Sequence, residues 1–234
     1  NANYAWILHM RSKLDVNRGI AGFLLANGAL NIGDAEGTLR KEVLERDRVE
    51  AIIVLPRDMF YTTDISVTLW IVNMNKKAGT VNGRQLRDRT HEVLFMDLRR
   101  WDENIEEIVI DKGKKKKKTV LDDTQIAKIK ETYANWQSAD TSQYFNVPEF
   151  CRSVKLYNSD LTEEERQAKV PTIESKGYSL APSKYIEFID HDLEIDYEAE
   201  MARIQAEMRD IISAEKKSQT MLEDAFRGIG YGID

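Results

Sequence analysis

Four short apolar segments constrain the fold of this chain more than any other feature of its sequence. Each has the length of one β-strand and is almost continuously apolar, which is typical of strands buried on both faces. They lie within residues 19–28, 49–56, 65–72 and 92–97. Helical periodicity occupies residues 1 to about 14 and residues 36–48, so helices and strands alternate along the chain. This alternation predicts an α/β sheet.

The sequence between residues 111 and 190 predicts a linker that is followed by helical structure. A basic run at Lys114–Lys118 is typical of a solvated tether. A helix is expected over residues 124–136, where apolar side chains recur at helical spacing. Either Asp122 or Asp123 can cap its first turn.

Residues 191–234 predict one long helix that extends to about Phe226. Its apolar side chains recur at alternating spacings of four and three residues, as in a heptad seam. These side chains are Tyr197, Met201, Ile204, Met208 and Ile211. Because the stripe is narrow and the rest of the helix is charged, it needs either a partner helix or its own domain to cover it. The chain is therefore expected to divide into residues 1–110, 111–190 and 191–234.

Composition excludes several classes of function. The 34 Lys and Arg residues are outnumbered by 40 Asp and Glu, which excludes a uniformly basic nucleic-acid-binding protein but not a local basic patch. One cysteine, Cys151, and three histidines provide little material for a metal site, so no metal is expected. No apolar run reaches the roughly 20 residues that span a bilayer. A soluble, cytoplasmic protein is expected, because a single cysteine suits a reducing compartment.

One long motif connects two of the apolar segments through an aromatic loop that is rich in hydroxyl groups. It reads Val54-Leu-Pro-Arg-Asp-Met-Phe-Tyr-Thr-Thr-Asp-Ile-Ser-Val-Thr-Leu-Trp-Ile-Val72. Five further segments surround it in order: Asn1-Ala-Asn-Tyr-Ala-Trp-Ile-Leu-His-Met10, Gly19-Ile-Ala-Gly-Phe-Leu-Leu-Ala-Asn-Gly28, Glu92-Val-Leu-Phe-Met-Asp-Leu-Arg99, Val147-Pro-Glu-Phe-Cys151 and Tyr178-Ser-Leu-Ala-Pro-Ser-Lys-Tyr185. As an ordered set, they cover most of the chain and resemble the modification (M) subunit of type I restriction-modification systems, which are adenine-N6 DNA methyltransferases.

The resemblance implies both a fold and an activity. Residues 1–110 would be the C-terminal part of a Rossmann-like methyltransferase sheet, followed by a mostly helical region with a long C-terminal helix. The implied reaction transfers a methyl group from S-adenosylmethionine to adenine N6 in duplex DNA. The implied partners are double-stranded DNA, a specificity (S) subunit, a restriction (R) subunit and a second M subunit.

The family's glycine-rich cofactor loop and its Asn-Pro-Pro-aromatic catalytic motif do not occur in this sequence. Two segments resemble them superficially, Asn146-Val-Pro-Glu-Phe150 and Gly228-Ile-Gly-Tyr-Gly232, but the first lacks the second proline and the second follows a helix instead of a strand. No catalytic residue is therefore assigned within this chain. Both motifs are expected upstream of Asn1, and the first helix, which begins without a cap, also predicts a longer protein. The isolated chain is expected to be inactive.

The resemblance also implies a substrate-binding loop. In related adenine methyltransferases, a loop aromatic before a late strand contacts the flipped base, and Phe60 matches it by its place before residues 65–72. Tyr61, Thr62 and Thr63 are further candidates, because their hydroxyl groups can bind phosphate or line a base pocket. The alternatives are that Phe60 is an ordinary core residue and that the hydroxyls cap their own turn.

Residues 75–89 predict a basic surface loop with two glycines and little periodicity. Its cations could bind DNA phosphates, and each such contact would add to the salt dependence of the affinity. The candidates are Lys76, Lys77, Arg84, Arg87 and Arg89. A solvated loop with no ligand is the alternative.

Two functions of other classes remain open at this point. One is a non-enzymatic helical interaction module that docks on a DNA-specificity subunit through the apolar stripe of residues 197–211. The other is a nucleic-acid tether that acts through Lys114–Lys118. The stripe residues are the docking candidates in either the enzymatic or the docking interpretation.

Overall fold

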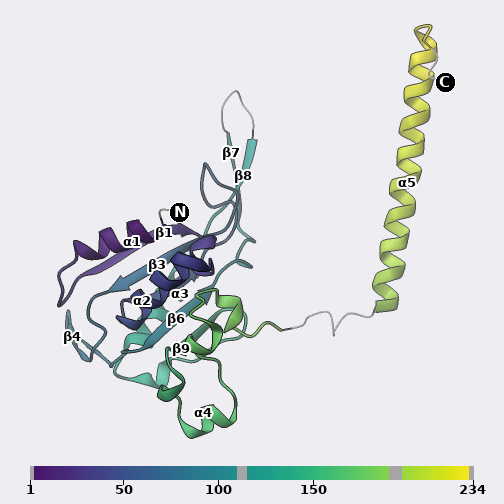
Figure 1. Cartoon of the computed structure of the whole chain (residues 1–234). Helices are drawn as coiled ribbons and strands as arrows, with labels where there is room; N and C mark the ends of the chain where they lie inside the picture. Colours follow the sequence, from purple (N-terminus) through teal and green to yellow (C-terminus); the bar gives the residue numbers. More distant parts are fainter. Residues whose placement is uncertain (1–2, 110–114, 190–196, 232–234) are drawn as a thin grey trace. The chain divides into compact units, whose positions relative to one another are not determined.

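The computed structural model describes residues 3–109, 115–189 and 197–231. The chain forms two compact units, residues 1–188 and residues 189–234. The first unit contains the β-sheet, and the second contains a long helix (Figure 1). Two predicted features lie outside the described residues: the domain boundary at residue 191, and the first lysine of the tether, at residue 114.

The first unit is built on a five-stranded mixed sheet with the strand order β1-β3-β2-β6-β9. Its strands are β1 Ile20–Ala26, β2 Val49–Val54, β3 Val67–Asn73, β6 Glu92–Asp97 and β9 Cys151–Lys155. Strand β3 is antiparallel to both β1 and β2, whereas β2 and β6 are parallel. Strands β1, β2 and β6 therefore run in one direction, and their carboxyl ends meet at one edge of the sheet. The four predicted strands and the mixed α/β architecture are confirmed.

Helices cover both faces of the sheet (Figure 1). Helices α1 Asn3–Ser12 and α2 Asp34–Glu45 contribute to one apolar core, which includes the fully buried Trp70. Helix α3 Asp123–Gln137 contributes Trp136 to a second core on the other face. Alternate residues of β2 and β6 enter the two cores, so both central strands are buried on both faces, as their apolar sequences predict.

Strand β1 differs from the prediction of burial on both faces. It lies at the edge of the sheet, and its residues alternate between exposed and half-buried. The side chains of Ile20 and Leu24 are 53% and 45% exposed. An apolar run alone does not distinguish an edge strand from a central one, because position within a sheet is set by partners far away in the sequence.

The structure forms two β-hairpins where the sequence predicts a loop and a linker. Strands β4 Gly79–Val81 and β5 Arg84–Leu86 pair across Asn82 and Gly83, which have φ values of 48° and 78°. An Asn-Gly turn with positive φ angles is the favoured two-residue hairpin turn, so the sequence did contain this signal. Strands β7 Ile105–Val109 and β8 Lys115–Thr119 form the second hairpin, so the prediction of a solvated linker is wrong for its lysines.

The remaining elements of the first unit are short. Helix α4 spans Glu163–Gln167, and single 3-10 turns span Asn27–Leu30, Thr141–Gln143, Asn158–Asp160, Glu174–Lys176 and Pro182–Lys184. Strand β9 belongs to the main sheet although it lies within residues 111–190, which the sequence predicts as linker and helices. Its pairing with β6 joins this segment to the sheet.

The second unit is helix α5 Tyr197–Gly228, and the prediction of a long C-terminal helix is confirmed. None of its described residues is buried. Within the part of the chain that the structure describes, no helix is both long and apolar enough to cross a membrane.

Helix α3 begins with a reciprocal cap at Asp122. The Asp122 carboxylate accepts a hydrogen bond from Gln125 N at 2.8 Å, and Asp122 N donates to Gln125 Oε1 at 3.0 Å. Replacing Asp122 by alanine leaves an amide of the first turn without its acceptor, so we expect a loss of about 1 kcal/mol in the free energy of unfolding. Chemical denaturation of the full-length protein measures this change. Asp123→Ala is the matched control and should change stability much less, because the carboxylate of Asp123 is not the cap.

Candidate functional site

The loop that carries Phe60 leaves the carboxyl end of β2 and returns into β3. Its base is closed by two hydrogen bonds: Leu55 N donates to Val67 O at 2.9 Å, and the Ser66 hydroxyl donates to Leu55 O. At its tip, Phe60 and Thr63 form an antiparallel bridge across a two-residue turn. The loop is thus a tight extension of the β2–β3 pair.

The structure brings the four predicted substrate-binding residues together at this tip. Phe60 and Thr63 are half-buried, whereas Tyr61 and Thr62 are exposed. The Thr63 hydroxyl accepts a long hydrogen bond of 3.4 Å from Ile65 N, which is the turn-capping role that the sequence left open for it. Tyr61 as a whole residue is 65% exposed.

Strand β8 packs directly against this loop, which the sequence did not predict. The Lys116 ammonium forms an ion pair with Asp64 and donates to Tyr61 O at 3.2 Å. The Lys118 ammonium lies 5.1 Å from the centre of the Tyr61 ring. Thr119 N donates to Asp58 O at 3.0 Å, so backbone bonding joins the base of the hairpin to the loop.

The ends of three strands place this loop at the carboxyl edge of the sheet. At this edge, the Thr68 hydroxyl donates to Asn27 Oδ1, which follows the end of β1, at 2.5 Å. Leu98 N, just after β6, donates to Val54 O at the end of β2, at 2.8 Å. In α/β sheets, ligands bind outside the carboxyl ends of the strands. The Phe60 loop therefore lies at the carboxyl edge of the sheet, which makes it a candidate binding loop.

The predicted phosphate-binding cations lie at the opposite edge of the sheet. They follow the end of β3 or precede the start of β6, and a strand of this length separates the two edges by about 20 Å. Lys77 and Arg84 are exposed and line a pocket of 540 Å³ together with Arg18. Arg84 also donates to Ala134 O at 3.0 Å. These cations cannot bind a phosphate next to a base held at Phe60.

Lys76 and Arg89 are structural, and the prediction that they bind DNA phosphates is wrong. Their exposed fractions are 3% and 1%. The Lys76 ammonium bonds to Asp47 at 2.5 Å and to Glu92 O at 2.6 Å, and burial lowers its pKa although the Asp47 carboxylate opposes this shift. Both side chains are buried and make their polar contacts within the fold.

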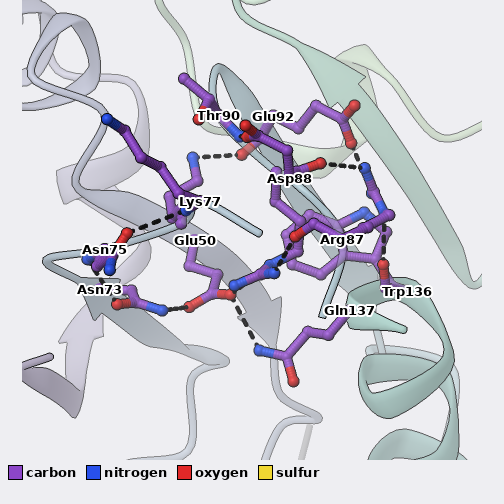
Figure 2. Close-up of polar contacts among 12 residues, drawn as sticks. Glu50, Asn73, Asn75, Lys77, Arg87, Asp88, Thr90, Glu92, Trp136 and Gln137 are labelled. Carbon is purple, nitrogen blue, oxygen red and sulfur yellow. Dashed lines mark hydrogen bonds and ion pairs between the residues drawn. The ribbon is translucent and has the colours of Figure 1, made fainter. Parts of the chain in front are cut away.

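Glu50 is the centre of this buried network (Figure 2). Its carboxylate, which is fully buried, accepts hydrogen bonds from Arg89 Nε and Gln137 Nε2, both at 3.0 Å, and from Asn73 Nδ2. Burial and the charge of Glu50 raise the pKa of the Tyr133 hydroxyl. The sequence reasoning missed this network, although a glutamate inside the apolar segment of residues 49–54 was a visible signal.

Arg87 extends the network towards α3. Its guanidinium bonds to Glu92 Oε2 at 2.6 Å and to Trp136 O at 2.7 Å (Figure 2). It also lies over the Trp136 ring, 5.3 Å from the ring centre. Its Nη1 also donates to Asp88 O at 3.0 Å. Arg87 thus holds α3 on the sheet, and these three polar contacts leave little of its guanidinium for a phosphate.

Asn146, in the segment that superficially resembles the catalytic motif, has a structural role. Its side chain accepts a hydrogen bond at 2.9 Å from Ser153 N, which lies in strand β9. Cys151 is buried within the second core, and burial raises the pKa of its thiol. Among the described residues, no group of three or more histidine, cysteine, aspartate and glutamate side chains is arranged to hold a metal ion.

The apolar stripe of α5 is exposed. The exposed fractions of its residues are 74% for Tyr197, 37% for Met201, 39% for Ile204, 57% for Met208 and 67% for Ile211. The helix also carries exposed ion pairs, such as Arg203 with Glu200 at 2.5 Å, which keep its other faces polar. An uncovered apolar stripe on a charged helix is typical of a surface that packs on another helix.

Comparisons with known proteins agree with the fold and with the sequence motifs. The chain is 26% identical over 231 residues to the methylase subunit of the type I restriction enzyme MjaIX from Methanocaldococcus jannaschii, and 29% identical over 235 residues to that of HindI from Haemophilus influenzae. Each alignment covers 99% of this chain, but only 36% and 44% of these curated relatives. The chain thus spans less than half the length of either protein.

A solved structure and a family profile extend this similarity. The methyltransferase subunit of a type I restriction-modification system from Streptococcus thermophilus superposes with a TM-score of 0.54 at 25% identity, covering 81% of this chain and 31% of that one. The sequence profile of the N-6 DNA methylase family matches residues 1–192, which include the whole sheet and the Phe60 loop. The chain therefore belongs to the N-6 DNA methylase family.

Proposed function

We propose that this chain is part of a type I modification subunit that transfers a methyl group from S-adenosylmethionine to adenine N6 in duplex DNA. The observation that carries the proposal is the position of the Phe60 loop, which projects from the carboxyl edge of a sheet of the N-6 DNA methylase family. The sheet order supports the finer assignment to the C-terminal part of a Rossmann-like methyltransferase sheet, because β3 runs antiparallel between β1 and β2.

The reaction requires the target adenine to leave the base stack so that N6 can meet the methyl donor. In the proposed complex, Phe60 contacts one face of the flipped base, and the ring of Tyr61 and the Thr62 hydroxyl lie beside it. Stacking on an aromatic ring offsets part of the cost of unstacking the base from its neighbours. The loop thereby holds the base in the orientation that methyl transfer needs.

The cofactor is not assigned to residues of this chain. S-adenosylmethionine supplies the methyl group. The contribution that we propose for the Phe60 loop is the positioning of the base.

A methyl-transfer assay tests this proposal. The full-length methylase polypeptide and its specificity subunit are combined with tritiated S-adenosylmethionine and with genomic DNA from a host that lacks the system. We expect N6-methyladenine in the digested DNA at a fixed sequence. A complex that assembles and binds DNA but forms no N6-methyladenine would contradict the enzymatic proposal and favour the docking module.

The exposed stripe of α5 supports docking on the helices of a specificity subunit, within an assembly that also includes a second M subunit and a restriction subunit. We expect the paired change Ile204→Asp and Met208→Asp to weaken binding to the specificity subunit by about tenfold or more, because charge would replace apolar side chains at the centre of the interface. Titration of labelled specificity subunit measures the dissociation constant.

Ala206→Asp is the matched control for this prediction. It adds an aspartate to the same helix, about half a turn away from the stripe. Its dissociation constant should remain close to that of the wild type. Equal losses of affinity in both variants would mean that the stripe does not pack on the specificity subunit. The charge of the helix as a whole would then determine the affinity.

A further inference from the structure

We propose that Lys116 and Lys118 are positioning residues that hold the Phe60 loop in the conformation required to receive the flipped base. This inference rests on the proposed methyltransferase function and adds a role for the β7–β8 hairpin. The two lysines contact the loop at its tip, through Tyr61, and just after the tip, through Asp64. Neither touches the base itself.

Alternation along β8 separates its lysines into two pairs. Lys116 and Lys118 are half-buried and face the loop, whereas Lys115 and Lys117 are exposed on the other face of the strand. Residues of a strand alternate between its faces, so a run of identical residues divides into two environments. The contacts of Lys116 and Lys118 therefore follow from the register of the hairpin.

The hairpin is a firm support for these contacts. Strand β8 pairs with β7 along its whole length. At its base, Val120 N donates to Asn104 O at 3.0 Å, and the Asn104 amide donates to the Asp122 carboxylate at 3.0 Å. Because Asp122 caps α3, the hairpin is tied to a helix that packs on the sheet.

The loop tip, in contrast, has few contacts of its own. Beyond the Phe60–Thr63 bridge, the polar contacts described for residues 57–64 include a long hydrogen bond of 3.4 Å from Arg57 Nε to Asp64 O. Lys116 bonds to the carbonyl of Tyr61 and to the carboxylate of Asp64 at once, so it holds the backbone of the turn and the side chain that follows the turn. Phe60 is adjacent to Tyr61 in the chain, and its ring direction depends on that backbone.

These contacts should affect catalysis more than stability. Asp64 is 66% exposed as a side chain, and exposed ion pairs contribute little to folding. A small displacement of a group that positions the substrate, however, can lower the rate by up to about a hundredfold. The expected signature is therefore a loss of base positioning in a complex that is still folded and still binds DNA.

The test uses the assembled methyltransferase complex and two duplexes. The first carries adenine at the target position, located by mapping N6-methyladenine, and gives kcat; the second carries 2-aminopurine there, cannot be methylated at N6, and reports base flipping, because its fluorescence rises when the base leaves the stack. With Lys116→Gln we expect at least about a tenfold lower kcat on the adenine duplex at saturating DNA, together with a reduced fluorescence rise on the 2-aminopurine duplex. Lys117→Gln is the matched control, because it removes the same charge from the opposite face of β8.

Two further variants distinguish positioning from a general effect of charge. Lys116→Arg keeps a cation that can reach Asp64 and should restore most of kcat. Asp64→Asn removes the ion pair and should lower kcat, and the double variant should be little worse than Lys116→Gln alone, because Lys116→Gln already removes that ion pair.

Each outcome of the test decides the inference. Equal kcat values for Lys116→Gln and Lys117→Gln in an active complex would overturn it, as would additive losses in the double variant. A wild-type complex that forms no N6-methyladenine would instead contradict the proposed function itself.

Discussion

Phe60→Ala will lower kcat for methyl transfer by about 10-fold to 100-fold, because stacking of a base on an aromatic side chain contributes about 1–3 kcal/mol. The loss should appear in kcat, since the stacking contact forms only after the base has left the duplex. Phe60 lies half-buried at the tip of the loop, where its truncation does not open either core. The measurement is single-turnover methylation with saturating DNA.

Phe60→Trp is the companion variant, because it keeps an aromatic face at the same position. It should retain most of the wild-type rate while Phe60→Ala loses it. If the alanine variant methylates DNA at the wild-type rate, Phe60 is an ordinary residue of the strand edge. The melting temperatures of both variants should match that of the wild type, which separates loss of contact from loss of fold.

Glu50→Ala should destabilise the folded sheet by about 3–5 kcal/mol, because it leaves the buried guanidinium of Arg89 without its carboxylate. The same change removes the acceptor for the amides of Asn73 and Gln137, which are also buried. For a unit of this size, we expect the melting temperature to fall by about 10 °C or more. Differential scanning calorimetry of the full-length protein measures this shift.

Arg46→Ala is the control for a broken ion pair at the surface. Arg46 pairs with Glu42 one helical turn away, and about half of each side chain is exposed. Exposed pairs of this type contribute less than about 1 kcal/mol, so its melting temperature should change by only a few degrees. Similar shifts for Glu50→Ala and Arg46→Ala would contradict the structural role that we assign to the Glu50 network.

The central strands and the main helices could be predicted from the sequence because their signals are local. The apolar run of β2, the helical spacing in α3 and the heptad seam of α5 each lie within one element. The aromatic loop was also predictable, since its motif carries the family resemblance. Sequence alone could therefore place Phe60 between two buried strands.

The relative position of the site residues could not be predicted in the same way. Lys77 and Phe60 are close in sequence, but strand β3 runs between their loops and places them at opposite edges of the sheet. The sequence predicts Lys76 and Arg89 as surface cations, because their partners Asp47 and Glu50 come close only in the folded chain. A loop prediction for residues 75–89 could not distinguish a cation that binds a ligand from one that binds the core.

The lysine run shows a further limit of sequence patterns. The run Lys115–Lys118 has no helical or strand periodicity, and taken alone it predicts a solvated tether. Its partner strand carries Glu106 and Glu107, which lie opposite Lys118 and Lys117 in the hairpin. The complementary charge of the two segments was the available signal that they pair as a hairpin. Only this strand pairing turns two of the lysines towards the Phe60 loop.

Photocrosslinking tests most directly the central claim that the Phe60 loop contacts the flipped base. The assembled complex is irradiated with a duplex in which 5-iodouracil replaces the target adenine, so that the base can bond to an aromatic ring in contact with it. We expect a crosslinked peptide that contains Phe60 or Tyr61, and loss of that crosslink in Phe60→Ala or in its double variant with Tyr61→Ala. A crosslink that maps to the β4–β5 hairpin would contradict this contact. So would the lack of any crosslink within residues 57–64 in a complex that is active on adenine.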